Sequence, residues 1–199
     1  MVRTIVKVGG GLLGRPGAFD LLAEGLTAFG VGRSALVVPG GGPFADAARE
    51  LFRRFKIGDE AAHWMAILGM DQYAHALVSR IPGAELVDQA PQIAAALDAG
   101  RLPVLAPYRW LRSADPLPHS WEVTSDSIAA WIAGAVGAAR VVLVKPAAGT
   151  PETLVDPQFL RILPQGVEYV VVTVDDLSAL RRALEEGRTP KGRRSSGGQ

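Results

Sequence analysis

The 199-residue sequence contains no cysteine, which excludes disulfide bonds and thiolate metal sites. It also lacks an apolar run of the roughly 20 residues that a membrane-spanning helix needs, and its first residues do not resemble a signal peptide. A net charge of +1 gives no reason to expect nucleic acid or an acidic membrane as a partner. The three histidines are scattered without metal-ligand spacing, so we expect no metal site built by the protein. These absences indicate a soluble, cytoplasmic protein.

Short apolar runs alternate with longer helical patterns along the whole chain. Most of the runs are unbroken rather than alternating, which is typical of parallel strands covered on both faces. This order predicts an α/β fold, a three-layer αβα sandwich around a mostly parallel central sheet. The predicted strands are Thr4–Val8, Ala35–Pro39, Ala84–Val87, Pro103–Ala106, Val141–Val144 and Tyr169–Val174, and the clearest predicted helices are Asp59–Arg80, Gln92–Ala99, Thr124–Ala135 and Asp176–Glu186.

The chain shows no internal repeat, linker or composition break that would divide it. We therefore predict one domain over residues 1–187. Residues 188–199 lack apolar anchors and are predicted to form a disordered tail.

The first predicted strand runs straight into three glycines, Gly9, Gly10 and Gly11. Without Cβ atoms these residues can turn sharply and let backbone N–H groups surround an anion. Three glycines alone are also compatible with a simple turn. Lys7 favours the anion site, because a lysine in a short apolar strand is costly unless its charge has a partner.

A second strand ends in Gly40, Gly41 and Gly42, and Pro43 then suits the first turn of a helix. The helix N-terminus and the glycine amides predict a second anion site. Two such clusters after separate strands favour phosphate chemistry. Neither cluster matches the P-loop motif, and neither shows the spacing of a dinucleotide-binding motif followed by an acidic residue.

A third segment begins a helix, with Thr124 or Ser125 as the cap and Asp126 in the first turn. Ordinary capping would explain these residues. However, the small residues Ala129 and Ala130 allow the helix to pack closely on the sheet. We therefore expect Asp126 to be held near the glycine clusters.

In this order, the three segments resemble the amino acid kinase family, which includes acetylglutamate kinase, uridylate kinase and isopentenyl phosphate kinase. The resemblance covers about residues 3–187. It implies an ATP-dependent kinase in which Mg²⁺ bridges ATP oxygens. In that family pattern, Lys7 would balance charge on the transferring phosphoryl group, and Asp126 would orient the active-site lysine. Gly9, Gly10 and Gly11 would bind the ATP phosphates, and Gly40, Gly41 and Gly42 would hold the acceptor and γ-phosphate.

Residues 106–112 and 117–127 resemble more narrowly a subgroup found with methanofuran biosynthesis. Its archaeal members phosphorylate an aminomethyl-furan-methyl phosphate. A small phosphate-bearing acceptor of this kind would suit Arg109 and Arg112, because guanidinium grips phosphate with two hydrogen bonds. Surface salt bridges would explain both arginines as well. Asp71 and His75 share a helical face and are candidates for contacting substrate, although a helix-surface pair is the alternative.

One feature of the family pattern is missing, namely a second phosphate-clamping lysine in a glycine-rich segment near the C-terminal third. Lys145, directly after an apolar strand, is the best substitute and is predicted to act in catalysis and nucleotide binding. Lys191 is a poorer choice. The gap leaves open a non-catalytic binding or storage protein, or a regulatory nucleotide sensor, on the same scaffold.

The ammonium of an aminomethyl-furan acceptor would favour a carboxylate or an aromatic face, for which Asp71, Asp115, Glu122 and Trp121 are candidates. Simple packing is the alternative for Trp121, and His63 and Trp64 are expected in a core or a subunit interface. The family resemblance also implies a homo-oligomer.

Overall fold

The computed structural model describes residues 1–149 and 154–185. Six strands form one sheet in the order β3-β4-β2-β1-β5-β6, and every neighbouring pair is parallel. The strands are β1 (Thr4–Val8), β2 (Ala35–Pro39), β3 (Ala84–Val87), β4 (Leu102–Leu105), β5 (Arg140–Lys145) and β6 (Glu168–Thr173). β1 lies in the middle of the sheet, between β2 and β5.

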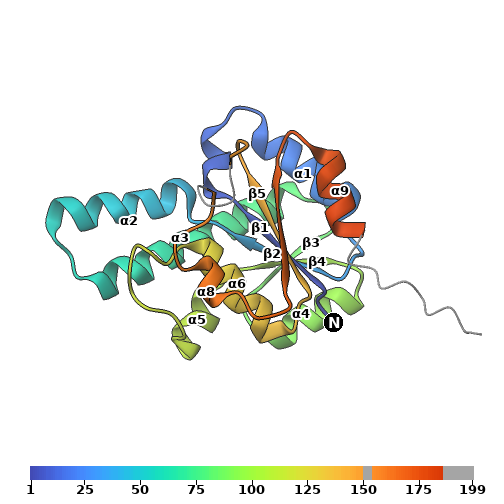
Figure 1. Cartoon of the computed structure of the whole chain (residues 1–199). Helices are drawn as coiled ribbons and strands as arrows, with labels where there is room; N and C mark the ends of the chain where they lie inside the picture. Colours follow the sequence, from blue (N-terminus) through green and yellow to red (C-terminus); the bar gives the residue numbers. More distant parts are fainter. Residues whose placement is uncertain (150–153, 186–199) are drawn as a thin grey trace, which may run out of the picture.

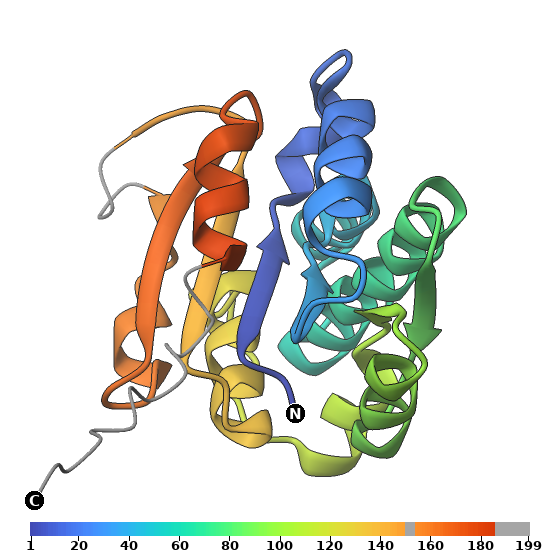
Figure 2. The ribbon, with the colours of Figure 1, turned by 90° about the vertical axis from the view of Figure 1, so that its right-hand side faces the viewer.

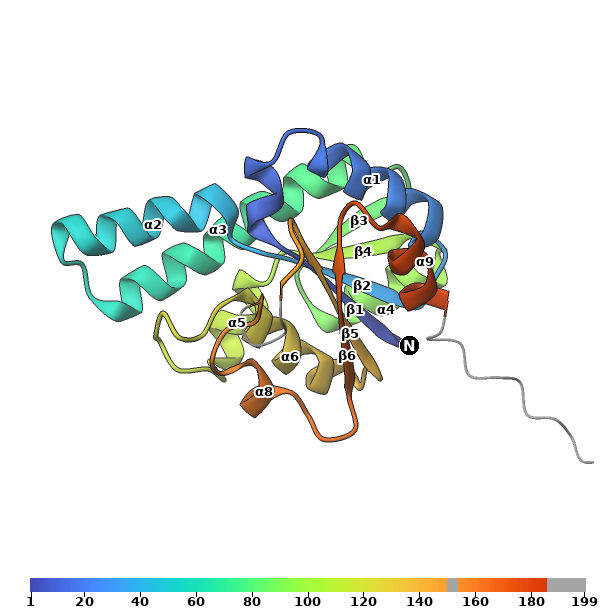
Figure 3. The ribbon, with the colours of Figure 1, turned by 45° about the horizontal axis from the view of Figure 1, so that its top comes forward.

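Helices cover both faces of this sheet (Figure 1). They are η1 (Gly10–Gly14), α1 (Ala18–Phe29), α2 (Gly42–Phe55), α3 (Asp59–Arg80), α4 (Ala90–Asp98), α5 (Tyr108–Ala114), α6 (Ser125–Val136), α8 (Phe159–Ile162) and α9 (Leu177–Glu185). α1 and α9 lie side by side over one face, and α6 lies under the other (Figures 2 and 3). The predicted three-layer α/β sandwich is confirmed.

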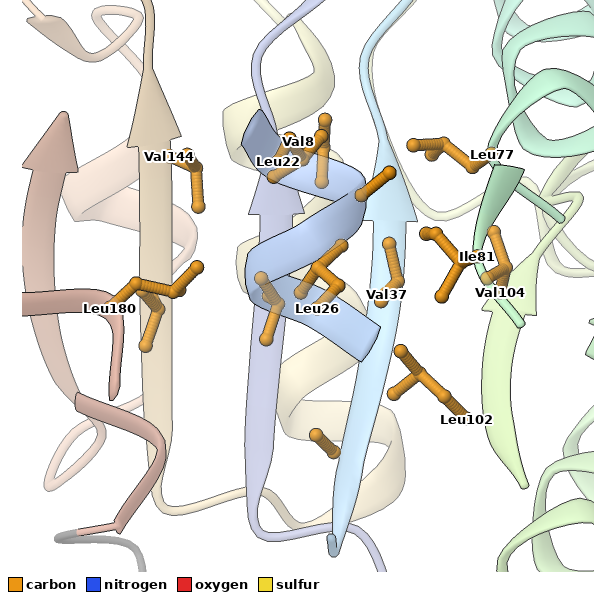
Figure 4. Close-up of a cluster of buried hydrophobic side chains, with 14 of the residues drawn as sticks. Val8, Leu22, Leu26, Val37, Leu77, Ile81, Leu102, Val104, Val144 and Leu180 are labelled. Carbon is orange, nitrogen blue, oxygen red and sulfur yellow. The ribbon is translucent and has the colours of Figure 1, made fainter. Parts of the chain in front are cut away.

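Alternate residues of the inner strands pack on opposite faces of the sheet. Val6 and Val8 of β1 join the core beneath α1 and α9, whereas Ile5 joins the core beneath α6. Figure 4 shows the first of these cores, where Leu22 and Leu26 of α1 lie among strand valines and Leu180 of α9. Strands that bury both sets of side chains need continuous apolar sequence, which is why the strands were recognisable.

The described strands begin and end within one residue of the predicted ranges. The helices α5 and α8 were not predicted, because seven and four residues are too short to show a helical apolar pattern. Residues 188–199 lie outside the described part, so the predicted tail is not tested. In the described part, no helix is long and apolar enough to cross a membrane.

The helices α2 and α3 form a hairpin that projects away from the sheet (Figures 1 and 3). Along α2, Ala48 is buried, whereas Leu51 and Phe55 are 37% and 60% exposed. The outer half of the hairpin has little but its partner helix to pack against.

Candidate functional site

Three charged side chains meet beyond the carboxyl ends of β1 and β5. The Nζ atom of Lys7 lies 2.8 Å from Oδ1 of Asp126. The Nζ atom of Lys145 lies 3.0 Å from Oδ1 and 2.8 Å from Oδ2 of the same carboxylate. The three side chains are only 4%, 5% and 11% exposed, for Lys7, Asp126 and Lys145 respectively. Two buried lysines therefore share one buried aspartate, and the cluster carries a net charge of +1.

The alternation of the strands explains why both lysines point the same way. Lys7 is two residues from Ile5, and Lys145 is two residues from Leu143, and both apolar residues belong to the core beneath α6. β1 and β5 are neighbours in the sheet, so the two lysines meet on that face although 137 positions separate them in the sequence. The strands β2, β3 and β4 lie on one side of β1, and β5 and β6 lie on the other. Open parallel sheets bind ligands at such a point, where the strand order switches from one side to the other.

The helix α6 supplies the aspartate from its first turn. Thr124 caps this helix, its hydroxyl accepting a hydrogen bond from the Asp126 backbone N–H at 3.4 Å. Ala129, Ala130 and Ala133 are fully buried against the sheet, which lets α6 approach β1 closely. The predicted cap and the predicted close packing are both present. Capping and charge organisation are thus compatible roles of one helix end.

Burial by itself raises the pKa of the Asp126 carboxyl, but the charges of Lys7 and Lys145 outweigh burial and hold the pKa below its usual range. Burial and the nearby Lys7 charge lower the pKa of Lys145, while Asp126 acts in the opposite direction. Asp126 is therefore an ionised partner of the lysines and a poor proton acceptor at neutral pH.

A second buried carboxylate, Asp156, holds the start of α6 in place. It accepts hydrogen bonds from the backbone N–H of Thr124 at 3.0 Å and from the Thr124 hydroxyl at 2.8 Å. It also accepts from the backbone N–H and the hydroxyl of Ser127, and from the backbone N–H of Gln158. Four of these five donors belong to the start of α6, so Asp156 fixes that first turn and with it the position of Asp126.

The two glycine clusters pack directly against one another. A Cβ atom on Gly10 would overlap the backbone nitrogen of Gly42, and a Cβ on Gly40 would lie 2.6 Å from the nitrogen of Gly10. The close approach explains why glycine is needed at these positions. It also brings together the first turns of η1 and α2, whose leading N–H groups have no intrahelical acceptor. The N–H groups of Gly9 and Gly40 donate to the carbonyls of Val144 and Val8, so these two amides are engaged within the sheet and were wrongly predicted as phosphate donors. The other four glycines, Gly10, Gly11, Gly41 and Gly42, line the same cavity as the lysines.

A cavity of about 290 Å³ opens over the lysine cluster and the glycine turns. Its inner end contains Lys7, Lys145, Asp126 and the paired glycines. Its outer end lies along the α2–α3 hairpin and the loop before α6. The cavity is lined by Lys7, Gly10, Gly11, Gly41, Gly42, Ala45, Asp46, Arg49, Asp59, His63, Ala66, Ile67, Met70, His119, Ser120, Trp121, Val123, Thr124, Ser125, Asp126, Ile128 and Lys145.

The amino acid kinase family model matches residues 2–149, which is most of the chain. The chain belongs to the amino acid kinase family. The lysine–aspartate cluster and both glycine turns are therefore features of an amino acid kinase domain, with Lys7, Asp126 and the glycines inside the matched residues.

Individual relatives agree with this membership. The chain is 25% identical over 144 residues to the [5-(aminomethyl)furan-3-yl]methyl phosphate kinase of Methanocaldococcus jannaschii, a match covering 72% of this chain and 66% of the relative. It is 39% identical over 100 residues to the acetylglutamate kinase of Methanopyrus kandleri, covering 46% of this chain and 39% of that protein. The chain thus spans less than two thirds of the length of both relatives. The crystal structure of UMP kinase from Bacillus anthracis has the same fold, with a TM-score of 0.68, 16% identity and 92% of each chain covered.

Four residues predicted to contact substrate do not line the cavity of this amino acid kinase domain. Arg109 lies 3.2 Å from Asp88, and Arg112 lies 3.6 Å from Glu60 with its guanidinium over the ring of Trp64. These contacts are the surface salt bridges that the sequence left as an alternative. The arginine that does line the cavity is Arg49.

The other two predicted contacts, Asp71 and His75, lie on one face of α3. Asp71 accepts a hydrogen bond from the backbone N–H of Tyr108 at 3.0 Å, at the start of α5. Burial raises the pKa of the Asp71 carboxyl, although this hydrogen bond and the neighbouring His75 act against the rise. His75 is exposed. A role for either residue in substrate binding remains a prediction.

Sequence reasoning missed several residues of the cavity. His63 was expected in a core or an interface, Asp59 and Arg49 carried no motif, and His119 was recognised only as part of the segment 117–127. Trp121, a candidate for an ammonium contact, does line the cavity. One signal was available for α3, because Asp59, His63, Ile67 and Met70 recur at helical spacing and mark a single face. The loop residues offered none, since only the fold brings them over the same opening.

The residues present fit a phosphate-bearing nucleotide. The inner end offers two lysines, a net positive charge and the backbone of Gly10, Gly11, Gly41 and Gly42, which are groups that suit phosphate. No group of three or more histidine or acidic side chains in the described part could hold a metal ion.

Proposed function

We propose that this protein is an ATP-dependent kinase that transfers the γ-phosphoryl group to a small molecule bearing a phosphate or carboxylate. The observation that carries the proposal is the Lys7–Asp126–Lys145 cluster, which shares the inner end of the cavity with the paired glycine turns. Phosphoryl transfer needs positioning and charge neutralisation more than covalent catalysis. Fixed lysines and amides stabilise the charge that develops on the equatorial oxygens.

The chemistry of the cluster favours an acceptor that is already ionised. In the transfer, an acceptor oxygen forms a bond to the γ-phosphorus while the bond to the β–γ bridging oxygen breaks, and ADP leaves with that electron pair. A phosphate or carboxylate oxygen needs no base for this step. Asp126, whose pKa is held low by two lysines, would be a poor base.

Each residue of the cluster then has a definite task. Lys7 would neutralise charge on the transferring group, and Lys145 would contact the nucleotide phosphates. Asp126 would hold both ammonium groups in place. Mg²⁺ bound with the nucleotide would supply further neutralisation of phosphate charge.

For the acceptor itself, we propose [5-(aminomethyl)furan-3-yl]methyl phosphate, the compound named for the Methanocaldococcus relative. The support is the match over 72% of this chain. Such an acceptor has a phosphate for the cationic inner end and one small ring for the rest of the cavity. The product would be the corresponding diphosphate.

The test is an ADP-release assay with Mg-ATP and a panel of acceptors, comprising the furan phosphate, acetylglutamate, uridylate and isopentenyl phosphate. We expect turnover with the furan phosphate and a fall in kcat of about 100-fold or more in Lys7→Ala, because Lys7 acts on the transition state. Unchanged kcat in a folded Lys7→Ala protein would contradict the assignment. ATP binding without turnover of any acceptor would instead indicate a binding or storage protein.

We also propose that the protein forms homo-oligomers. The support is the apolar surface of the α2–α3 hairpin, where Leu51, Phe55 and Leu68 are exposed. Light scattering on the purified protein checks this. A monomer at micromolar concentration, unchanged by Phe55→Ser, would contradict it.

A further inference from the structure

The outer end of the cavity contains hydrogen-bond acceptors that have no partner in the described structure. Asp59, His63, Ile67 and Met70 project from one face of α3 and form one wall. This stripe extends about 16 Å at 1.5 Å per residue, from Met70 near the glycine turns outward to Asp59. An acceptor whose phosphate sits at the inner end would extend along this wall toward His63, with Asp59 one helical turn further out.

Most other ionisable groups at this end are already paired with one another. Arg49 lies 2.6 Å from Asp46, and its guanidinium rests over the ring of Trp121 at 4.7 Å. His119 lies 2.9 Å from Asp115 through its Nε2 atom. Each of Asp46, Arg49 and His119 therefore has at least one partner within the protein.

Asp59 and His63 differ from these neighbours. Within residues 1–149 and 154–185, no side chain or backbone group hydrogen-bonds or ion-pairs with the Asp59 carboxylate or with a ring nitrogen of His63. The His63 ring is instead held by stacking on His119, with centroids 4.2 Å apart, and by an edge contact with Trp64 at 4.8 Å. The stack orients the imidazole while leaving its nitrogens available.

Burial lowers the pKa of His63 to about 4, and the nearby His119 adds to this effect while Asp115 opposes it. The ring is therefore neutral at pH 7 and keeps one nitrogen lone pair that can accept a hydrogen bond. Asp59 and His63 lie one helical turn apart on α3. A carboxylate and a neutral imidazole together offer hydrogen-bond acceptors and carry no positive charge.

We propose that Asp59 and His63 recognise a primary ammonium group at the end of the phosphoryl acceptor remote from its reacting phosphate. The cavity would then be polarised to match a zwitterionic substrate, with lysines at the inner end for the phosphate and acceptors at the outer end for the cation. An ammonium has three donors, and Asp59 and His63 supply two acceptors. This inference rests on the proposed kinase function and assigns the specificity of the same cavity.

The experiment compares two acceptors that share the reacting phosphate and differ only in the amine. One is [5-(aminomethyl)furan-3-yl]methyl phosphate, and the other is (furan-3-yl)methyl phosphate, which lacks the aminomethyl group. We expect the wild-type protein to prefer the amine in kcat/KM by about tenfold or more. Asp59→Asn should raise KM for the amine by a similar factor, with kcat, KM for ATP and the reaction of the amine-free acceptor unchanged.

Glu60→Gln is the matched control, because Glu60 is the next residue of α3 and faces Arg112 outside the cavity. It should leave the preference intact. His63→Leu should reduce the preference in the same direction as Asp59→Asn. Thermal unfolding of each variant checks the fold, and Asp59 is exposed, so Asp59→Asn should fold normally.

The outcomes separate the two proposals. Turnover of both acceptors at equal efficiency by the wild type, or equal losses for both acceptors in Asp59→Asn, would overturn the ammonium site and leave the kinase standing. Turnover confined to an acceptor without an amine would also overturn the ammonium site and leave the kinase function standing. Absence of turnover with every acceptor would overturn the proposed function and this inference with it.

Discussion

Replacing Asp126 with asparagine tests the charge cluster without altering its shape. Asparagine keeps an oxygen that can accept from one lysine, and its backbone N–H can still donate to the Thr124 hydroxyl. The substitution removes the single negative charge between Lys7 and Lys145. The buried cluster then changes from a net charge of +1 to +2.

The size of the effect follows from the geometry. Both ammonium groups lie within 3.0 Å of the carboxylate, and both lysines are almost fully buried. Removing one partner of a buried ion pair costs about 3–5 kcal/mol, because the remaining charge is left uncompensated. For a domain of this size, each kcal/mol lowers the Tm by about 2–4 °C, so we expect a loss of roughly 6–20 °C at pH 7.

The free energy of unfolding of Asp126→Asn should depend on pH differently from that of the wild type. Folding lowers the pKa of Lys145, so the unfolded chain binds more protons between that lowered value and about 10.5, and the free energy of unfolding rises with pH there. Without Asp126 the pKa of Lys145 falls further. Asp126→Asn should therefore recover stability as the pH rises from 7 toward 10, more strongly than the wild type.

At low pH the two proteins should differ in the opposite sense. The depressed pKa of Asp126 stabilises the wild-type fold above about pH 4, and this contribution is lost as the pH falls through the folded-state value. The asparagine variant has no such contribution to lose. Its unfolding free energy should therefore converge with that of the wild type in acid.

The assay is thermal unfolding across pH 3–10, with and without inorganic phosphate, together with kcat measured on folded protein. Phosphate should raise the Tm of Asp126→Asn more than that of the wild type, since the doubly charged cluster binds an anion more tightly. We expect kcat to fall by about 100-fold. A Tm within 2 °C of the wild type at pH 7, together with an unchanged pH profile, would refute the view that Asp126 neutralises both lysines.

Two further substitutions test the parts that hold the cluster in place. Gly10→Ala should cost about 1–3 kcal/mol and weaken nucleotide binding, because its Cβ would overlap Gly42, whereas Gly14→Ala, with no atom within 4 Å of its Cβ, should be nearly neutral in the same denaturant titration. Equal costs at the two positions would count against close packing of the glycine turns. Asp156→Ala should leave five donors unsatisfied, four of them at the start of α6, lowering both the free energy of unfolding and kcat, and normal kcat per folded molecule would show that Asp156 does not position Asp126.

Much of the fold was readable from local patterns. The strands of a parallel sheet are short, continuous and apolar, and the described ones lie where those runs occur. The helix α5 was not predicted, because seven residues are too few to show a helical period. The exposure of Leu51 and Phe55 in α2 could not be predicted, since an apolar stripe in sequence does not reveal whether the same chain covers it.

Some residues of the candidate site could also be recognised from local sequence, and others could not. Lys7 and the glycine clusters stood out because a charge in an apolar strand and repeated glycines are unusual in their local context. Arg109 and Arg112 also looked suitable for phosphate, but the fold turns them toward Asp88 and Glu60. Asp156 was invisible, because a lone aspartate in a loop has no pattern until α6 is placed beside it.

The sequence by itself determined the elements of this protein, their alternation and the residues whose chemistry suits phosphate, since all of these depend on neighbours a few positions apart. Only the tertiary structure decided that β1 and β5 lie side by side, and hence that Lys7 and Lys145 share one aspartate. It also decided that His63 and Asp59 line the same cavity as those lysines. Such contacts join residues far apart in the chain, and they arise from how the sheet is ordered and how the helices pack, which no local pattern encodes.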